Sequence, residues 1–204
     1  MAEARADVVI LLLAAGASSR MRGADKLLQR IDGVPVLRRQ AQAMASLGRK
    51  VIVALPPDRP LRGAALEGLN VQRLAVAEAA TGMAASIRAG TAAAQRAAGL
   101  AILPADMPEI TAQDMAQVLQ AFAAQNAQRI AQGCGADGTP GHPVIFPARL
   151  LGALAALRGD RGARAVLQGE DVLHIPLPAR HALTDLDTPE DWADWLAGRE
   201  YDKQ

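Results

Sequence analysis

The residues best suited to chemistry lie in a short loop behind an apolar run. The run, 9–13, has the length of a buried strand. The loop begins A-A-G-A-S-S and then presents two cations, Arg20 and Lys26. Small side chains allow backbone N–H groups to face outward and bind oxygen atoms, while fixed cations neutralise negative charge. This pattern predicts a polyphosphate-binding loop, and the alternative is a strand-to-helix turn that merely requires small residues.

A second candidate is Asp106, which lies directly behind a short apolar strand at 100–103. A carboxylate in that position is costly unless it meets a cation or hydrogen-bond donors. Mg²⁺ commonly binds one or two carboxylates together with phosphate oxygens, so Asp106 is a candidate metal ligand. The alternative is that Asp106 caps the next helix, but Thr111 and Asp114 form a better capping pattern.

The stretch T-D-L-D-T-P-E-D, 184–191, places two more carboxylates before a helix start. Residues two apart in an extended segment point to the same side, so Asp185 and Asp187 could face one cation together. Either carboxylate could instead stabilise the N-terminus of the helix. The spacing alone leaves both alternatives open.

Further candidates lie at the later strand and helix starts and beside Lys26. His142 stands between Gly and Pro at a predicted strand start, which should hold it rigidly near the end of the sheet. Arg161 and Arg164 are three positions apart at a helix start and could share a phosphate. The alternatives are a structural histidine and a solvated helix face. Asp25 is expected to orient the loop rather than to contact a ligand.

The elements that position these residues alternate between strand and helix, which predicts an α/β fold with a mainly parallel sheet. A late β-rich stretch predicts a mixed edge. Ligands of such sheets bind outside the carboxyl ends of the strands, where the polar clusters fall, so one shared site is expected. The expected strands are 9–13, 51–55, 71–76, 100–103, 127–131, 142–146 and 172–176, and the expected helices are 35–47, 61–66, 81–98, 111–124, 147–159 and one from 188.

Composition narrows the class of protein. The 204 residues suffice for one domain, 1–204, with flexible ends expected at 1–6 and 199–204. A net charge of +1 and only two Trp, two Phe and one Tyr argue against nucleic-acid binding. Cys134 is single, so no disulfide or cysteine zinc site forms within one chain. The apolar run is too short for a signal peptide or membrane span, and a cytoplasmic protein is expected.

The loop from Leu13 to Lys26 resembles the signature L-A-A-G-x-S-x-R-M-(x)-G-x-x-K of the nucleotidyltransferases related to molybdenum cofactor cytidylyltransferase and molybdopterin guanylyltransferase. One residue more than the commonest spacing separates Met21 from Gly23. Segments similar to the family's G-M-x-x-S-I-x-x-G, D-M-P, G-H-P-V, G-D-x-G-A-R and D-x-D-T-P-E-D follow in order across most of the chain. The resemblance implies a Rossmann-like, three-layer α/β/α nucleotidyltransferase fold.

The resemblance also assigns roles to residues. It implies that Arg20 and Lys26 are catalytic and that Asp106 and Asp187 hold Mg²⁺, with Asp185 as the alternative second ligand. It implies a nucleotide site at the loop and at the start of the 81–98 helix, although that helix could instead be an ordinary Ala-rich one. The implied nucleotide-binding residues are Leu13, Ala14, Ala15, Gly16, Ser18, Lys26, Gly82 and Ser86, and the implied acceptor-binding residues are His142, Arg161 and Arg164.

The activity implied by the resemblance is transfer of CMP from CTP to the phosphate of molybdopterin, with release of pyrophosphate. The sequence Ala14-Ala15-Gly16, in place of Ala-Gly-Gly, is similar to the cytidylyl branch and favours CTP over GTP. Related enzymes act on sugar phosphates or methylerythritol phosphate, which are alternative acceptors. A non-catalytic carrier that delivers molybdenum cofactor to a recipient such as a molybdenum hydroxylase is a further alternative. The joint presence of Arg20, Lys26, Asp106 and Asp187 argues against a degenerate site.

Overall fold

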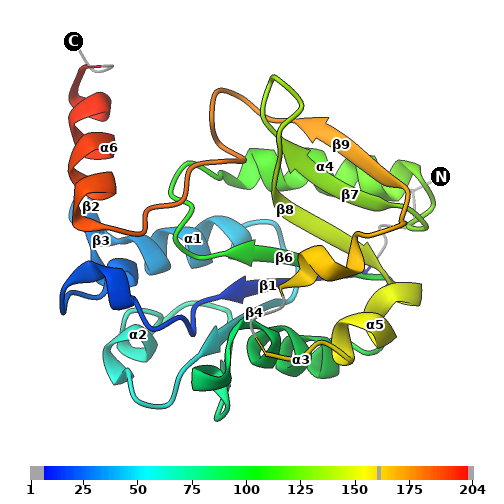
Figure 1. Cartoon of the computed structure of the whole chain (residues 1–204), viewed down its shortest axis with the longest axis horizontal. Helices are drawn as coiled ribbons and strands as arrows, with labels where there is room; N and C mark the ends of the chain where they lie inside the picture. Colours follow the sequence, from blue (N-terminus) through cyan, green and yellow to red (C-terminus); the bar gives the residue numbers. More distant parts are fainter. Residues whose placement is uncertain (1–6, 160–161, 202–204) are drawn as a thin grey trace.

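A seven-stranded sheet forms the centre of the molecule, as the computed structural model shows for residues 7–159 and 162–201 (Figure 1). Its order is β5-β4-β1-β6-β8-β7-β9. Only β8 runs antiparallel to its neighbours β6 and β7, and the other adjacent strands are parallel. The expected mixed, mainly parallel sheet is confirmed. The strands are β1 (Val8–Leu13), β4 (Val51–Leu55), β5 (Gln72–Ala75), β6 (Gly99–Pro104), β7 (Ile130–Cys134), β8 (Pro140–Pro147) and β9 (Val172–Pro176).

Helices cover both faces of the sheet, which gives the expected three layers. Alternate residues of a strand point to opposite faces. Ile10 of β1 accordingly packs in one core with side chains of α1 (Val36–Ala45) and α4 (Ala112–Ala124). Leu11 packs in a second core with side chains of α3 (Met83–Ala93) and α5 (Leu151–Ala155). The Rossmann-like α/β/α prediction is therefore confirmed.

Smaller elements complete the chain around the carboxyl ends of the strands. A two-stranded hairpin, β2 (Arg30–Ile31) and β3 (Val34–Pro35), was not expected from the sequence. The short α2 (Pro60–Ala64) follows β4, and α6 (Pro189–Tyr201) lies at one side of the molecule (Figure 1). Short 3₁₀ turns at Ser19–Met21, Lys26–Leu28, Ala79–Thr81, Ala148–Leu150 and Ala163–Val166 fill the connections.

The helix expected at 147–159 is a 3₁₀ turn followed by α5, which ends at Ala155. Two other expected elements differ from the structure for local reasons. The helix expected at 81–98 ends at Ala93, because the chain must turn to enter β6, and the Ala98 N–H donates to the Asp7 carbonyl at 2.7 Å. The strand expected at 127–131 begins at Ile130, since Asn126 and Ala127 have positive φ angles of 52° and 56°. Such angles end a helix and cannot continue a strand.

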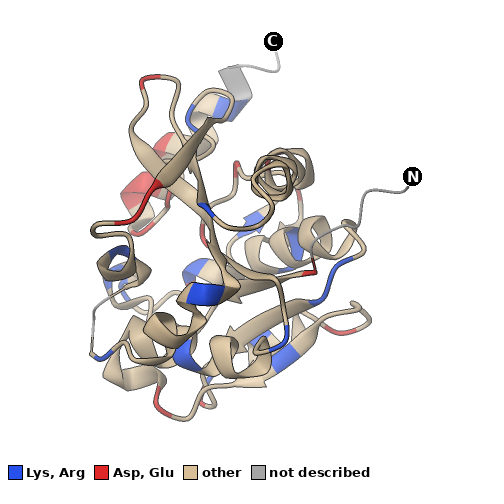
Figure 2. Ribbon diagram, turned by 90° about the vertical axis from the view of Figure 1, so that its right-hand side faces the viewer, with Lys and Arg blue, Asp and Glu red and all other residues tan. Residues whose placement is uncertain are grey.

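The expectation of flexible ends can be compared with the structure only at 199–201, which are helical. Residues 1–6 and 202–204, expected to be flexible, lie outside the described residues. Helix α6 continues to Tyr201, and within it Arg199 forms an ion pair with Asp32 at 3.0 Å and stacks over the Trp195 ring. None of the described helices is long and apolar enough to cross a membrane. Basic and acidic residues are interspersed over several elements (Figure 2).

Gly90 explains how closely α3 approaches the sheet. A side-chain carbon at Gly90 would overlap the Leu11 side chain of β1. The helix therefore packs directly on β1. Its N-terminus at Met83 stands beside the carboxyl ends of the strands, where the loop that follows β1 begins.

Candidate active site

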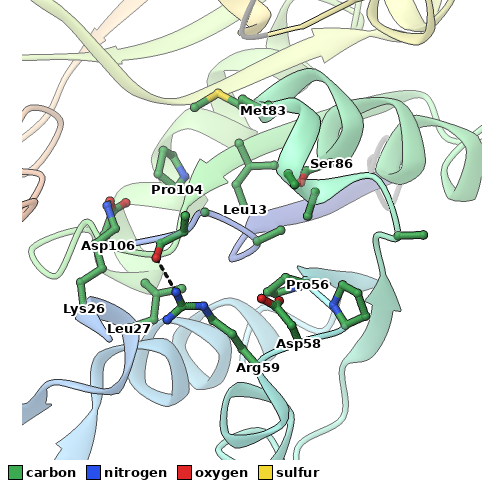
Figure 3. Close-up of a pocket in the computed structure, with 18 residues that line it drawn as sticks. Leu13, Lys26, Leu27, Pro56, Asp58, Arg59, Met83, Ser86, Pro104 and Asp106 are labelled. Atoms are coloured by element: carbon green, nitrogen blue, oxygen red, sulfur yellow. Dashed lines mark hydrogen bonds and ion pairs between the residues drawn. The ribbon is translucent and has the colours of Figure 1, made fainter. Parts of the chain in front are cut away.

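One cavity of about 610 Å³ opens beyond the carboxyl ends of β1, β4 and β6. Its volume lies within the roughly 300–1,000 Å³ typical of small-molecule sites. Lys26 and Asp106 lie at one end, and Pro56, Asp58 and Ser86 lie toward the other (Figure 3). The predicted nucleotide-site residues that line it are Leu13, Ala15, Gly16, Lys26, Gly82 and Ser86.

Two predicted nucleotide-site residues face the protein instead. Ala14 is buried, its N–H donates to the Ala54 carbonyl, and its carbonyl accepts from Arg62 at 2.7 Å. The Ser18 hydroxyl oxygen accepts from Arg62 at 3.0 Å. Both residues therefore shape the loop, and neither lines the cavity.

Arg62 of α2 is the main contact of the loop and was missed from the sequence. Its side chain has no exposed surface. It donates to the carbonyls of Ala14 and Gly16, to Ser18, and to both carboxylate oxygens of Asp25. Nothing in P-D-R-P-L-R marks a buried arginine, because Arg62 lies 46 positions from Gly16 and the segment resembles a surface turn.

Asp25 orients the loop, as the sequence predicts. Its carboxylate accepts from the Leu27 N–H at 3.0 Å and from Arg62 at 2.8 and 2.9 Å, and Arg59 lies 3.3 Å away. Burial alone would raise the pKa of the Asp25 carboxyl, but the hydrogen bonds and charges of Arg62, with smaller effects of Leu27 and Arg59, hold it below its usual value. Asp25 is therefore ionised and engaged entirely with the protein side of the loop.

Lys26 lies between the two carboxylates that the sequence analysis selected as metal ligands. Its ammonium contacts Asp106 and lies 2.7 Å from an oxygen of Asp187. All three side chains are mostly buried, with exposures of 15%, 12% and 20%. Burial lowers the pKa of Lys26, but the two carboxylates outweigh burial and raise it above its usual value. Asp106 thus meets the cation that its position after a buried strand requires.

Asp187 is not the cap of helix α6. The Asp191 carboxylate accepts from the N–H groups of Asp187 and Thr188, and the Thr188 hydroxyl accepts from the Asp191 N–H. The Asp187 carboxylate is thereby left to Lys26 and to Arg20, whose side chain is 67% exposed and 2.8 Å away. In the same way Thr111 and Asp114 form the predicted capping box of α4, so that Asp106 caps no helix.

The loop before α6 reaches β6 through its backbone. The Leu186 N–H donates to the Asp106 carbonyl at 3.3 Å, which sets Asp187 beside Asp106. Desolvation, followed by the charges of Asp187 and Asp106, raises the pKa of the neighbouring Asp185 carboxyl. The charges of Asp106 and Asp187 thus act on Asp185. Among the described residues, the two carboxylates in ion pairs with Lys26 are those of Asp106 and Asp187.

The donor set fits a divalent cation that arrives with phosphate. Within the described ranges no group of three or more His, Cys, Asp or Glu side chains could hold a metal ion by itself. Asp106 and Asp187 do face a common point, which the ammonium of Lys26 occupies. Mg²⁺ needs only one or two carboxylates when phosphate oxygens and waters complete its shell. A metal at this pair would therefore depend on the nucleotide.

The structure describes two of the three predicted acceptor residues, His142 and Arg164. His142 belongs to β8, and its backbone N–H donates to the Ala182 carbonyl. A side-chain carbon at Gly141 would overlap that carbonyl. Burial lowers the pKa of the His142 imidazole, although the Asp106 charge acts in the opposite direction. Arg164 is exposed and does not line the cavity, and Arg161 lies outside the described residues.

The residues on either side of Asp160 and Arg161, Gly159 and Gly162, lie beside the cavity. The Ala84 N–H at the start of α3 donates to the Gly159 carbonyl at 3.3 Å. A side-chain carbon at Gly162 would lie 3.2 Å from the sulfur of Met83, which lines the cavity. Both ends of the G-D-R-G segment therefore lie against the first turn of α3.

Comparison with known proteins identifies the family to which the chain belongs. The model of the MobA-like NTP transferase domain matches residues 10–175. The chain belongs to this family. It is a nucleotidyltransferase, and residues 10–175 extend from within β1 to within β9.

One curated protein and two solved structures resemble the chain over most of its length. It is 32% identical to the molybdenum cofactor guanylyltransferase of Pseudomonas aeruginosa (strain LESB58), over 89% of this chain and 90% of that protein. The crystal structure of Rv0371c from Mycobacterium tuberculosis H37Rv superposes with a TM-score of 0.76 at 27% identity, covering 94% and 98% of the two chains. Rv0371c has also been crystallised in complex with manganese, and that structure superposes with a TM-score of 0.70 at 24% identity, covering 94% and 98%.

Proposed function

We propose that this nucleotidyltransferase moves a nucleoside monophosphate, most readily CMP from CTP, to the phosphate of a molybdopterin-type acceptor and releases pyrophosphate. The observation that carries the proposal is that the loop after β1, Lys26 and Asp106 line one cavity, and that Lys26 also contacts a second carboxylate, Asp187. The curated relative that is a molybdenum cofactor guanylyltransferase supports the acceptor class. A molybdenum hydroxylase would be a suitable recipient of the product.

The reaction requires positioning and charge neutralisation rather than covalent catalysis. An oxygen of the acceptor phosphate attacks the α-phosphorus of the NTP. The bond between the α-phosphorus and the oxygen that bridges it to the β-phosphate breaks, and pyrophosphate leaves. The attacking oxygen is already anionic, so no general base is needed. Arg20 and Lys26 would bind the phosphates and balance the negative charge that develops on the leaving pyrophosphate. Neither the buried Cys134 nor a nucleophilic histidine is required.

Asp106 and Asp187 would hold a divalent cation, for which we propose Mg²⁺, together with the bound NTP. Bound there, the cation supplies positive charge to phosphate oxygens and orients them. Lys26 would then leave the carboxylate pair, because the cation takes over its role, and its ammonium would turn to the phosphates. The manganese complex of Rv0371c supports a divalent-metal requirement in a protein of the same fold.

The identity of the nucleotide base is the more specific part of the proposal. Ala15 lines the cavity, and its methyl group takes space that a glycine would leave open. The smaller pyrimidine of CTP suits such a site. GTP is the second candidate, because the curated relatives at 32% identity are guanylyltransferases.

On the acceptor side, we propose that His142 and the Arg161–Arg164 segment bind the phosphate of the acceptor. Burial favours the neutral imidazole of His142, which can donate one hydrogen bond to a phosphate oxygen. Sugar phosphates or methylerythritol phosphate remain the alternative acceptors, and cofactor delivery without catalysis remains the alternative function.

Pyrophosphate release from each of the four NTPs, with Mg²⁺ and with or without molybdopterin, tests the proposal. We expect release that depends on the acceptor and is fastest with CTP. Release with GTP alone would convert the assignment to guanylyl transfer. Tight nucleotide or cofactor binding without any pyrophosphate would identify a carrier, and release with a sugar phosphate in place of molybdopterin would change the acceptor.

A further inference from the structure

We infer that Arg62 is a positioning residue that turns the backbone N–H groups of the loop toward the triphosphate. This inference rests on the proposed function, since it concerns how the same loop binds phosphate. Arg62 is fully buried and does not line the cavity, so it cannot contact the nucleotide itself.

The first step is the complete use of the guanidinium. Arginine has five N–H donors in a fixed fork. Those of Arg62 make five hydrogen bonds, all to the loop: Nε and one terminal N–H to Asp25, two to the carbonyls of Ala14 and Gly16, and one to Ser18. Their lengths lie between 2.7 and 3.0 Å. A single side chain therefore defines the course of the loop from residue 14 to residue 25.

The second step follows from the planarity of the peptide. In a trans peptide the carbonyl of one residue and the N–H of the next point in opposite directions. Because the carbonyls of Ala14 and Gly16 point at Arg62, the N–H groups of Ala15 and Ala17 point away from it. Ala15 and Ala17 line the cavity, and Arg62 lies behind them.

Arg59 holds the next peptide of the loop, but it does so from the cavity. Its guanidinium donates to the Ala17 carbonyl at 2.5 Å, and Arg59 itself lines the cavity. Among the described residues, no protein carbonyl accepts from the N–H groups of Ala15 or Ala17. Two backbone donors are thus kept for oxygen atoms of a ligand, as in other concave anion sites made of backbone N–H groups.

The backbone of the loop also needs this support. Ser18 has φ of 53° and ψ of 34°, a left-handed conformation that costs energy for a residue other than glycine. Such a conformation persists only where the surroundings hold it. Arg62 provides that support, because the same terminal nitrogen donates to the Ser18 hydroxyl and to the Asp25 carboxylate.

Arg62→Lys tests the inference, because lysine keeps the charge but has three donors and no planar fork. The probes are CTP, inorganic triphosphate and CMP, which lacks the β- and γ-phosphates. We expect CTP and inorganic triphosphate to bind about tenfold more weakly or worse, since misdirected N–H donors lose charge-assisted hydrogen bonds. CMP should bind nearly as before. In turnover, the loss should raise the KM for CTP more than it lowers kcat.

Arg38→Lys is the matched control. Arg38 also donates to two backbone carbonyls, those of Ala65 and Glu67 directly behind α2, but neither of these bonds is to the loop after β1. The Arg38→Lys variant weakens the attachment of α2 but leaves the contacts of the loop unchanged, so it shows which of the two matters for binding. We expect Arg38→Lys to keep the affinity for all three probes.

Several outcomes would overturn the inference. Equal loss for CMP and triphosphate in Arg62→Lys, or equal loss of triphosphate binding in Arg38→Lys, would reduce Arg62 to a stability residue. Unchanged triphosphate binding in Arg62→Lys would do the same. If Arg62→Lys does not fold, Asp25→Asn carries the same comparison, with a smaller loss in the same direction expected. Wild-type protein that binds no NTP would contradict the proposed function instead, whatever the variants do.

Discussion

Lys26 and Asp187 lie 161 positions apart in the sequence, and their charged groups are 2.7 Å apart in the structure. The same ammonium contacts Asp106 at the end of β6. The contact joins the loop after β1 to the loop before α6, so nearly the whole chain is needed to form it. It also places the charge of one cation between two carboxylates that would otherwise repel each other.

Lys26→Ala should lower turnover by about 10²- to 10³-fold, the typical effect of removing one contact to transition-state charge. Steady-state pyrophosphate release with saturating NTP measures it. Lys50→Ala is the control, because the Lys50 ammonium contacts only the exposed backbone at Ala93 among the described residues. A Lys26→Ala protein with turnover near that of Lys50→Ala would refute a catalytic role.

The pH dependence of folding should reveal the Asp25–Arg62 pair. Arg62 and Arg59 hold the pKa of Asp25 below its unfolded value of 3.8. Ionised Asp25 therefore stabilises the protein fully above that value, and the contribution disappears as pH falls through the folded pKa. Asp25→Asn leaves the buried Arg62 without its carboxylate, so we expect a loss of roughly 2 kcal/mol between about pH 5 and 8.

Urea unfolding of wild type and Asp25→Asn over a pH series checks this expectation. The difference in unfolding free energy should be constant near neutrality and should shrink as pH falls below about 4. Asp171→Asn, which removes the exposed partner of Arg129, should differ little from wild type at any pH. A difference for Asp25→Asn that persists undiminished to acid pH would show that charge is not its cause.

The base preference should follow Ala15. We expect CTP to bind more tightly than GTP in the presence of Mg²⁺, and Ala15→Gly to reduce that preference by opening the cavity wall. Calorimetric titration of both proteins with CTP, GTP, ATP and UTP measures the ratio. Tighter binding of GTP by wild type would reject the CTP assignment.

The sequence predicted that residues behind the carboxyl ends of the strands would lie close together, for a simple physical reason. Lys26 and Asp106 follow apolar strands, and the ends of neighbouring parallel strands meet at one edge, so residues behind them meet as well. Asp187 was predicted only as one of two alternatives. The choice required knowing that Asp191 and Thr188 cap α6 and free Asp187 for Lys26.

The remaining part of the site depends on contacts that no local pattern encodes. Arg62 lies in a five-residue helix, and it is buried because the loop after β1 folds back over it. His142 and Pro143 were placed correctly in a strand, which begins two residues earlier than expected, at Pro140. The approach of Ala182 to that strand depends on a turn far along the chain. Such pairings follow from the tertiary arrangement and not from hydrophobic periodicity.

The thermal stability of Asp106→Asn tests most directly whether this carboxylate pair holds the metal of a bound NTP. Wild-type protein should gain about 2.7 kcal/mol when Mg²⁺ and CTP are present at 100 times their Kd. For a domain of this size that gain corresponds to a rise of roughly 5 to 10 °C in melting temperature. Asp106→Asn should lose about 1 kcal/mol without ligand, because Lys26 loses one of its two partners. In the presence of CTP, Mg²⁺ should no longer raise its melting temperature further, whereas an Mg²⁺-dependent rise as large as that of wild type would contradict a metal site at Asp106.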